Sequence, residues 1–259
     1  MPGRITILGS GTSYGVPVIG CGCDVCRSTD PRDKRTRSAA WIQGEKGTSI
    51  IIDVGPDLRQ QCLRENISHV DAVFLTHTHA DHLNGIDDLR AFSKADKMEL
   101  PLYASKEDRH FLRKHFEYIF AQKSETIVWG LPQLALRHVE DGPFAVGEFT
   151  VNAVPLVHGR WTSTGYRIGN LAYLTDCSAV PEESLKCLGN LDVLVIDALR
   201  WNPHVTHNSI TESIVVAERI RPKLTVFTHM SHDISHERDS KLLPKGFCFA
   251  YDGMTLDFS

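Results

Sequence analysis

Short apolar runs rich in β-branched and aromatic residues recur along the chain, separated by polar or glycine-containing segments. Runs of this length and composition are typical of buried β-strands. The pattern predicts strands at Ile5–Leu8, Ala39–Ile42, Ser49–Ile52, Ala72–Leu75, Phe149–Val157, Gly165–Ile168, Leu171–Leu174, Val193–Ile196 and Leu224–Phe227.

Helical periodicity occurs between several of these strands. It predicts helices at Asp57–Glu65, Lys106–Tyr118, Glu182–Leu188 and Ile210–Ile220. Before the last of these, Ser209 and Glu212 have the spacing of a capping box, and Pro222 follows its apolar stripe. Because strands and helices alternate without an internal repeat or a low-complexity tract, the sequence predicts an α/β fold.

Acidic and histidine side chains follow five of the predicted strands within two residues. They are Asp53, His77, His158, Asp176 and His229. Functional sites in α/β proteins commonly form at strand ends, where loops meet over a rigid sheet. One such residue would be an ordinary turn residue, but five of them predict a common site.

The segment Thr76–His82 is the densest source of metal ligands in the chain. It places His77, His79, Asp81 and His82 directly after an apolar run. Imidazole nitrogen and carboxylate oxygen bind zinc, manganese and iron, and the two-residue spacing of the first histidines lets both reach one ion. The alternative is a polar loop that ends a strand.

Together these residues predict two adjacent metal sites. We expect His77, His79 and His158 to bind one ion, Asp81, His82 and His229 to bind the other, and Asp176 to bridge them. Seven ligands leave room for water on each ion, and a hydroxide bridging two ions is a nucleophile suited to hydrolysis of a charged ester. Asp53 is expected to accept a hydrogen bond from a ligand imidazole, or else to cap a turn.

A second candidate metal site lies in the segment of residues 21–26. Cys21, Cys23 and Cys26 suit one soft cation, and a structural zinc is expected there. His232 is the expected fourth ligand, with His236 in reserve. The alternative is a set of redox-active or inert buried thiols. The other cysteines, Cys62, Cys177, Cys187 and Cys248, are isolated and are expected to fill core space.

Composition limits the classes of function. The 259 residues, 42% hydrophobic and 23% charged, predict one globular domain over residues 1–259, with no apolar stretch of the roughly 18 residues that span a membrane. The start of the chain lacks a signal-peptide core, and the cysteines form no disulfide pattern, so we expect a cytoplasmic protein. A net charge of −4 argues against nucleic-acid or membrane partners. The basic segment Arg32–Arg37 is either a phosphate-docking site or a solvated loop.

The series His77-x-His79-x-Asp81-His82, His158, Asp176 and His229 resembles the ligand series of the metallo-β-lactamase superfamily across nearly the whole chain. The resemblance implies a four-layer αβ/βα sandwich with a dinuclear site at one edge of two facing sheets. The β-lactamases themselves match poorly, since many have Cys or Arg where this chain has Asp81 and a second-metal histidine.

The opening of the chain narrows the resemblance. Gly9-x-Gly11, Gly15-Val16-Pro17 and the cysteine motif, with His229-x-x-His232 and Asp252-Gly253-Met254, resemble the phosphodiesterases of the bacterial carbon–phosphorus lyase pathway, the PhnP family. That family hydrolyses 5-phosphoribosyl 1,2-cyclic phosphate. PqqB proteins share the cysteine motif but tend to lack an intact HxHxDH.

The resemblance implies a metal-dependent phosphodiesterase acting on a small cyclic phosphate. A histidine before a late helix acts at the leaving group in that family, and His207 occupies this position, with His204 as a competitor. The nitrogen and oxygen ligands of the catalytic pair accept manganese, zinc or iron alike, and the resemblance implies a homodimer. The alternatives are an RNase Z-like or cyclic-nucleotide phosphodiesterase, and a non-hydrolytic metal-binding or redox protein of the same fold.

Overall fold

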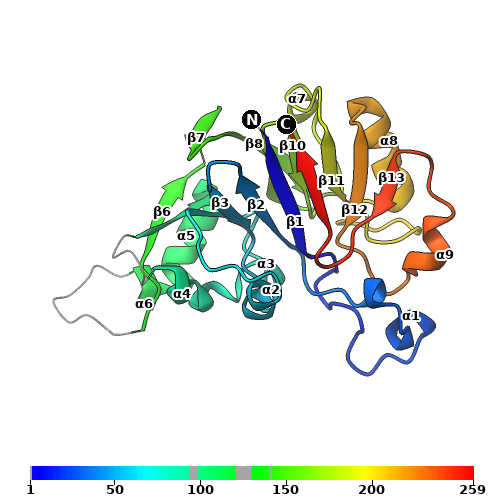
Figure 1. The fold of residues 1–259 in the computed structure, drawn as a ribbon, viewed down its shortest axis with the longest axis horizontal. Helices are drawn as coiled ribbons and strands as arrows, with labels where there is room; N and C mark the ends of the chain where they lie inside the picture. The colour runs from blue at the N-terminus through cyan, green and yellow to red at the C-terminus, as the bar shows by residue number, and fades with distance from the viewer. Residues whose placement is uncertain (1, 94–98, 121–129, 140–141) are drawn as a thin grey trace.

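The computed structural model describes residues 2–93, 99–120, 130–139 and 142–259. In these residues the strands form two seven-stranded sheets that face each other (Figure 1). The first has the order β14 (Thr255–Phe258), β1 (Gly3–Gly9), β2 (Ala39–Gly44), β3 (Ser49–Ile52), β4 (Ala72–Phe74), β5 (Leu100–Ala104) and β6 (Leu134–His138). The second has the order β13 (Phe247–Phe249), β12 (Leu224–Thr228), β11 (Val193–Asp197), β10 (Leu171–Leu174), β9 (Trp161–Ile168), β8 (Phe149–His158) and β7 (Phe144–Val146).

Each sheet contains a run of parallel strands. Strands β3 to β6 of the first sheet are parallel to one another, and so are β10 to β13 of the second. Parallel strands end at the same edge of a sheet, so the polar residues that follow β3 and β4, and those that follow β10 and β12, are brought to common edges.

Helices cover the outer faces of the two sheets. The helices of the described residues are α1 (Asp24–Arg27), α2 (Leu58–Arg64), α3 (Ala80–Leu83), α4 (Arg90–Ser93), α5 (Lys106–His115), α6 (Glu117–Phe120), α7 (Glu182–Leu185), α8 (Ile210–Ile220) and α9 (His236–Ser240), with 3₁₀ turns at Pro31–Asp33 and Ile86–Leu89. Leu58 of α2 and Leu112 of α5 belong to one apolar cluster with Ile51 of β3. Ala217 and Ile220 of α8 pack on the second sheet, outside which α8 lies in Figure 1. The predicted four-layer αβ/βα sandwich is therefore confirmed.

Strand β3 shows why the predicted strands are continuous apolar runs. Ile50 and Ile52 face the space between the sheets, whereas Ile51 faces the helices, as the two-residue period of a strand requires. Across the sandwich, the rings of Phe74 and Tyr166 lie 4.8 Å apart. A strand buried on both faces needs apolar side chains at every position.

All nine predicted strands are present, and the structure adds five: β5, β6, β7, β13 and β14. The prediction of one helix over Lys106–Tyr118 was wrong, because the backbone leaves the helical region at Phe116 (φ −119°, ψ 41°) and separates α5 from α6. Helix α7 ends at Leu185 rather than Leu188, and α8 has the predicted bounds Ile210–Ile220.

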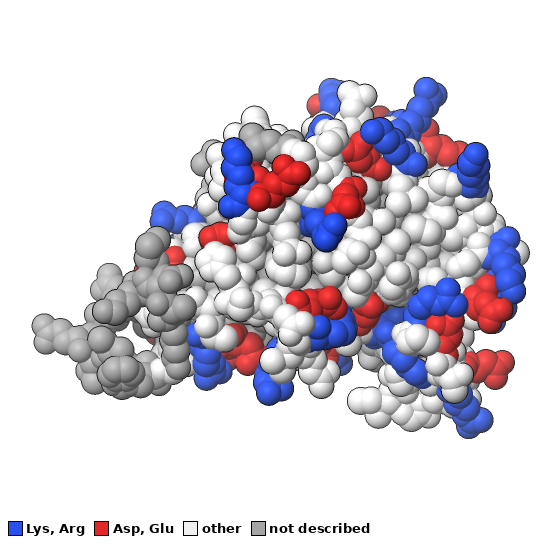
Figure 2. Space-filling view, viewed as in Figure 1, with Lys and Arg blue, Asp and Glu red and all other residues white. Residues whose placement is uncertain are grey.

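Charged side chains of both signs lie on the surface of the protein. Basic and acidic side chains are interspersed on the face shown in Figure 2, where neither sign forms an extended patch. Within the described ranges, none of the helices combines the length and the apolarity needed to cross a lipid bilayer.

Candidate metal centre

Three residues at strand ends have left-handed backbone conformations. They are Asp53 (φ 65°), Asp176 (φ 52°) and His229 (φ 60°), after β3, β10 and β12. A non-glycine residue in this region costs free energy and persists only where the surrounding structure holds it. The two sheets supply that support, since each of these residues lies buried beside a fixed strand end.

The predicted ligand segment is divided between a loop and a short helix. His77 and His79 lie on the loop after β4, whereas Asp81 and His82 lie on α3. The helix packs closely on the turn after β3, because a Cβ atom at Gly55 would lie 1.9 Å from the carbonyl oxygen of Asp81. Glycine at position 55 therefore lets α3 approach the strand end.

The structure brings the predicted ligands into two groups that share Asp176. The first is His77, His79, His158 and Asp176, and the second is Asp81, His82, Asp176 and His229. Oδ2 of Asp176 lies 3.7 Å from Nε2 of both His77 and His158. Its Oδ1 lies 3.1 Å from Nε2 of His82 and 3.2 Å from Nε2 of His229. Each carboxylate oxygen thus faces one group.

These separations fit metal coordination. Two ligand atoms bound to one ion at about 2.1 Å lie about 3 to 3.5 Å apart, close to the separations found around Asp176. In addition, Nε2 of His77, His82 and His229 is buried without a hydrogen-bond partner among the described residues. Buried polar atoms are normally paired, so three unpaired nitrogens facing carboxylates indicate positions for cations.

Hydrogen bonds at the other ring nitrogens orient the ligand histidines. Nδ1 of His82 lies 2.7 Å from Oδ2 of Asp53, and Nδ1 of His158 lies 2.7 Å from the carbonyl oxygen of Thr206. Both contacts leave Nε2 directed at Asp176. The expected contact between Asp53 and an imidazole of the candidate ligand set is present, and Asp53 also accepts from the backbone amide of Thr76, as a turn cap does. Such contacts fix the tautomer of a metal ligand.

The electrostatics of the site also favour cations. Burial opposes protonation of His82, but Asp176, Asp53 and Asp81 together raise its pKa well above the usual value. At His77 burial dominates and lowers the pKa. The buried carboxylates therefore create a negative electrostatic potential, which stabilises a positive charge at the site.

His207 lies against both ligand groups. Its ring stacks on His229 with centroids 4.7 Å apart and lies 4.8 Å from the ring of His158. Its Nδ1 lies 2.8 Å from Oδ2 of Asp197. Burial acts to lower the pKa of His207, but Asp197 outweighs it and raises that pKa to about 9. His204 is exposed, and its ring lies 5.3 Å from that of His207.

Asp197 is the site residue that the sequence reasoning missed. It ends β11, is fully buried, and accepts hydrogen bonds from His207 and from the backbone amide of Cys177. Its Oδ1 lies 3.8 Å from Nδ1 of His229. The sequence contains a signal that could have identified it, since Asp197 directly follows the apolar run Val193–Ile196, just as Asp53 directly follows β3.

The three cysteines of residues 21–26 converge on His232. Nδ1 of this histidine lies 3.3 Å from Sγ of Cys21, 3.4 Å from Sγ of Cys23 and 3.5 Å from Sγ of Cys26. These distances suit four ligands of one tetrahedral zinc. His236, the reserve ligand, lies outside the group, and its backbone amide donates to Asp33.

The basic segment Arg32–Arg37 is held by carboxylates. The ion pairs are Arg32 with Asp30, Arg35 with Asp33 and Arg37 with Asp57. The side chain of Arg35 is fully buried and also donates to the carbonyl oxygen of Ser231. The segment therefore joins parts of the structure, and its arginines are engaged within the protein.

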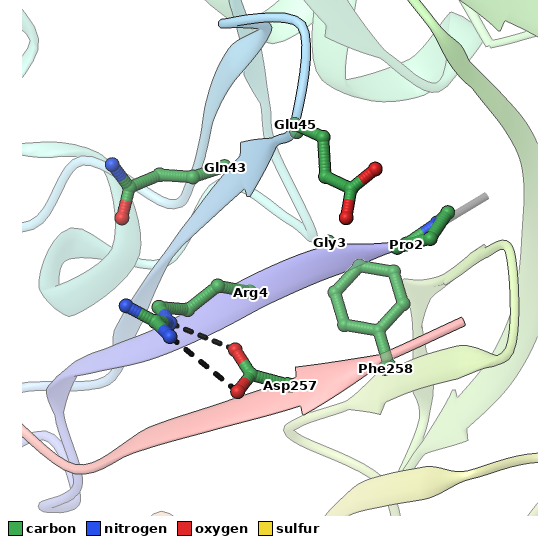
Figure 3. Close-up of a pocket in the computed structure, with 8 residues that line it drawn as sticks. Pro2, Gly3, Arg4, Gln43, Glu45, Asp257 and Phe258 are labelled. Carbon is green, nitrogen blue, oxygen red and sulfur yellow. Dashed lines mark hydrogen bonds and ion pairs between the residues drawn. The ribbon is translucent and has the colours of Figure 1, made fainter.

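An open cavity lies at the far end of the first sheet. Figure 3 shows its lining, with Arg4 and Asp257 paired across β1 and β14 at 2.8 Å. The cavity surrounds the first residues of β1, whereas the metal ligands follow the last residues of β3 and β4. Among the described residues, those that line the cavity form no group of metal-ligating side chains, and the candidate ligands lie at the opposite end of the sheet.

Known proteins match this chain over most of its length. Residues 48–230 match the family model described as a beta-lactamase superfamily domain. A crystal structure described as a new diphosphatase from the PhnP family is 41% identical, with a TM-score of 0.92, and the match covers 100% of this chain and 98% of that one. The chain belongs to the PhnP family of metallo-β-lactamase-fold hydrolases.

Other relatives of this PhnP-family chain have different names. An octanoyltransferase of Porphyromonas gingivalis is 39% identical over 254 residues, which are 97% of this chain and 51% of that protein. The chain thus spans about half the length of that relative. Zn²⁺-bound PqqB from Methylobacterium extorquens shares the fold, with 21% identity, a TM-score of 0.77, and coverage of 98% of this chain and 99% of that one.

Proposed function

We propose that the protein hydrolyses a small phosphodiester, such as 5-phosphoribosyl 1,2-cyclic phosphate, at the site centred on Asp176. The observation that carries the proposal is that the two oxygens of Asp176 face two separate ligand groups. Two divalent cations bound there, zinc, manganese or iron, would lower the pKa of water toward neutrality and neutralise charge on a phosphate. A structural zinc at Cys21, Cys23, Cys26 and His232 completes the proposed metal content.

The protein's own groups provide orientation and a proton. Asp53 and the carbonyl oxygen of Thr206 hold His82 and His158 in place. His207 has its Nδ1 engaged by Asp197, so Nε2 is free to protonate the departing oxygen of the ester. Asp197 raises the pKa of His207 to about 9, which favours the protonated ring that an acid requires. Proton transfer of this kind contributes about a hundredfold to ten-thousandfold in rate.

A diphosphate is the second candidate substrate class. The relative that supports it is the 41% identical PhnP-family diphosphatase, whose match covers the whole chain. Both substrate classes present a phosphorus atom with a leaving oxygen that requires neutralisation. The net charge of −4 favours a small anion, drawn in by the metals, over a tRNA. The homodimer implied by the family resemblance stays a prediction.

Replacing a single metal ligand tests the proposal. Asp81→Ala is expected to retain the fold, to lose metal from the catalytic site and to lower turnover by at least about a hundredfold. The measurements are metal content by mass spectrometry and hydrolysis of a panel of cyclic phosphates, linear diesters and diphosphates. Asp257→Ala, at the opposite end of the first sheet, is the matched control. Full activity in Asp81→Ala would exclude the dinuclear site.

A further inference from the structure

The carboxylate of Asp252 lies outside the candidate metal centre and joins two distant segments of the chain. Its Oδ1 accepts hydrogen bonds from the backbone amide and the hydroxyl of Ser10, at 2.9 and 2.8 Å. Its Oδ2 accepts from the amide and the hydroxyl of Thr36, at 2.8 and 2.5 Å. The side chain of Asp252 is only 9% exposed. The carboxylate therefore holds Ser10, which follows β1, against Thr36, which precedes β2.

This arrangement requires a carboxylate at position 252. A carboxylate has about four acceptor positions and no N–H group, so it can pair with all four donors. Burial raises the pKa of Asp252, although the hydrogen bonds from Thr36 and Ser10 favour the ionised form. In asparagine, an N–H group would face the backbone amide of one of these residues, which cannot become an acceptor. The next residue, Gly253, donates its amide to the carbonyl oxygen of Ile7 in β1 at 2.8 Å, which fixes the motif to the strand that leads to Ser10.

Ser10 in turn holds the residue that follows His229. Its carbonyl oxygen accepts from the backbone amide of Met230 at 3.0 Å, and Met230 is fully buried. On the other side of His229, the amide of Ala198 donates to the carbonyl oxygen of Thr228 at 3.0 Å. The backbone of His229 is therefore fixed from both sides, by the end of β11 and by the segment that Asp252 holds.

The orientation of His229 depends on these backbone contacts. Nδ1 of His82 and Nδ1 of His158 each lie 2.7 Å from a hydrogen-bond partner. Nδ1 of His229 has no such partner among the described residues, and its distance from Oδ1 of Asp197 is 3.8 Å. The left-handed backbone of His229 (φ 60°) also persists only while neighbouring contacts hold it. The position of its imidazole therefore depends on the hydrogen bond from Met230 to Ser10.

We propose that Asp252 is a positioning residue for the second ligand group, acting on His229 through Ser10 and Met230. The proposal rests on the dinuclear site of the proposed function and adds to it a residue from outside the ligand series. The first ligand group does not contain His229. Loss of the Asp252 carboxylate is therefore expected to weaken the binding of one ion and to spare the other, whereas a general loss of stability would not distinguish between the two ions.

Titration with Mn²⁺, after a chelator has removed metal from the dinuclear site, tests this role. Asp252→Asn is expected to bind one Mn²⁺ with the wild-type affinity and the second about tenfold to a hundredfold more weakly, the loss typical of residues that orient a ligand. Calorimetry gives the two affinities, and electron paramagnetic resonance distinguishes an isolated Mn²⁺ ion from a coupled pair. Ser10→Ala, which removes only the hydroxyl donor to Oδ1, is expected to show a smaller loss at the same ion.

Asp71→Asn is the matched control. It changes a carboxylate that also accepts from a backbone amide, that of Ser49, at the opposite end of β3 from the candidate ligands. This variant is expected to bind both Mn²⁺ ions with the wild-type affinities, whatever its effect on the melting temperature.

Two results would overturn the role of Asp252. One is wild-type affinity for both Mn²⁺ ions in Asp252→Asn or, if that variant does not fold, in Ser10→Ala. The other is an equal weakening of both ions, which would indicate a general loss of structure. Hydrolysis of phosphate esters is assayed separately on the wild type. Two bound Mn²⁺ ions without hydrolysis would contradict the proposed function and leave the role of Asp252 intact.

Discussion

The candidate metal centre depends on residues that adopt an unfavourable backbone conformation in order to present ligands or to orient one. Asp53, Asp176 and His229 each have φ between 52° and 65°. A non-glycine residue there costs about 1 to 3 kcal/mol, and glycine would remove the strain. Glycine would also remove the carboxylate or imidazole, so the strain at these strand ends is retained where function requires a side chain.

At the residue scale, Asp197→Asn tests how His207 works. The amide cannot stabilise a protonated imidazole, so hydrolysis of esters with alkoxide leaving groups is expected to fall about a hundredfold, as in His207→Ala. Esters of 4-nitrophenol have a leaving group that needs no proton, and both variants are expected to hydrolyse them at nearly the wild-type rate. Values of kcat/KM for both ester classes show whether Asp197 acts through the protonated His207. An equal loss on both classes would show that Asp197 supports the metal site instead.

At the scale of elements, the sequence predicted helices and strands most accurately where the local residue pattern was strongest. Helix α8 has its predicted bounds because Ser209 and Glu212 form the capping box seen in the sequence. The strands that were missed are weaker signals for a physical reason. Four of them, β14, β6, β13 and β7, are the edge strands of the two sheets, which pair on one side only, and the fifth, β5, contains Pro101. The pattern of apolar residues therefore predicts central strands better than edges.

Removing the cap of α8 has a predicted cost. In Ser209→Ala the hydrogen bond from the amide of Glu212 to Oγ of Ser209, 3.3 Å long, is lost. The free energy of unfolding is expected to fall by about 1 kcal/mol, as for other N-cap residues. Urea denaturation of the variant measures the change, with Ser209→Thr as a control that retains a hydroxyl. An unchanged denaturation midpoint would contradict the capping role.

At the scale of the whole molecule, the cysteine group joins distant parts of the chain. Cys21, Cys23 and Cys26 meet His232, three residues after His229, a proposed ligand of the dinuclear site. Between these histidines, Met230 exchanges backbone hydrogen bonds with the N-terminal loop, through Ser10 and Thr12. A metal ion at the cysteines would therefore stabilise the loop that carries a ligand of the other site.

Loss of the proposed structural zinc has two expected effects. Cys23→Ser is expected to reduce the zinc content by one equivalent per chain and to lower the melting temperature by about 5 °C or more, since the ion binds only the folded chain. Elemental analysis and calorimetry measure these changes. Cys187→Ser, at a half-buried cysteine outside the group, is the control and is expected to keep its zinc. Unchanged zinc content in Cys23→Ser would refute the assignment.

The sequence by itself determined the central strands, the candidate ligand residues and the family. Those signals are local, since a burial pattern, a ligand spacing and a cap each need only a few neighbouring residues. Tertiary structure decided which atoms of Asp176 face which histidines, the pairing of His207 with Asp197, and the hydrogen bonds of Asp252 to two distant segments. These depend on the approach of two sheets and of the loops that follow their strands, where residues far apart in sequence meet. Contacts between side chains that are far apart in the sequence leave no periodic pattern of residues from which they could be predicted.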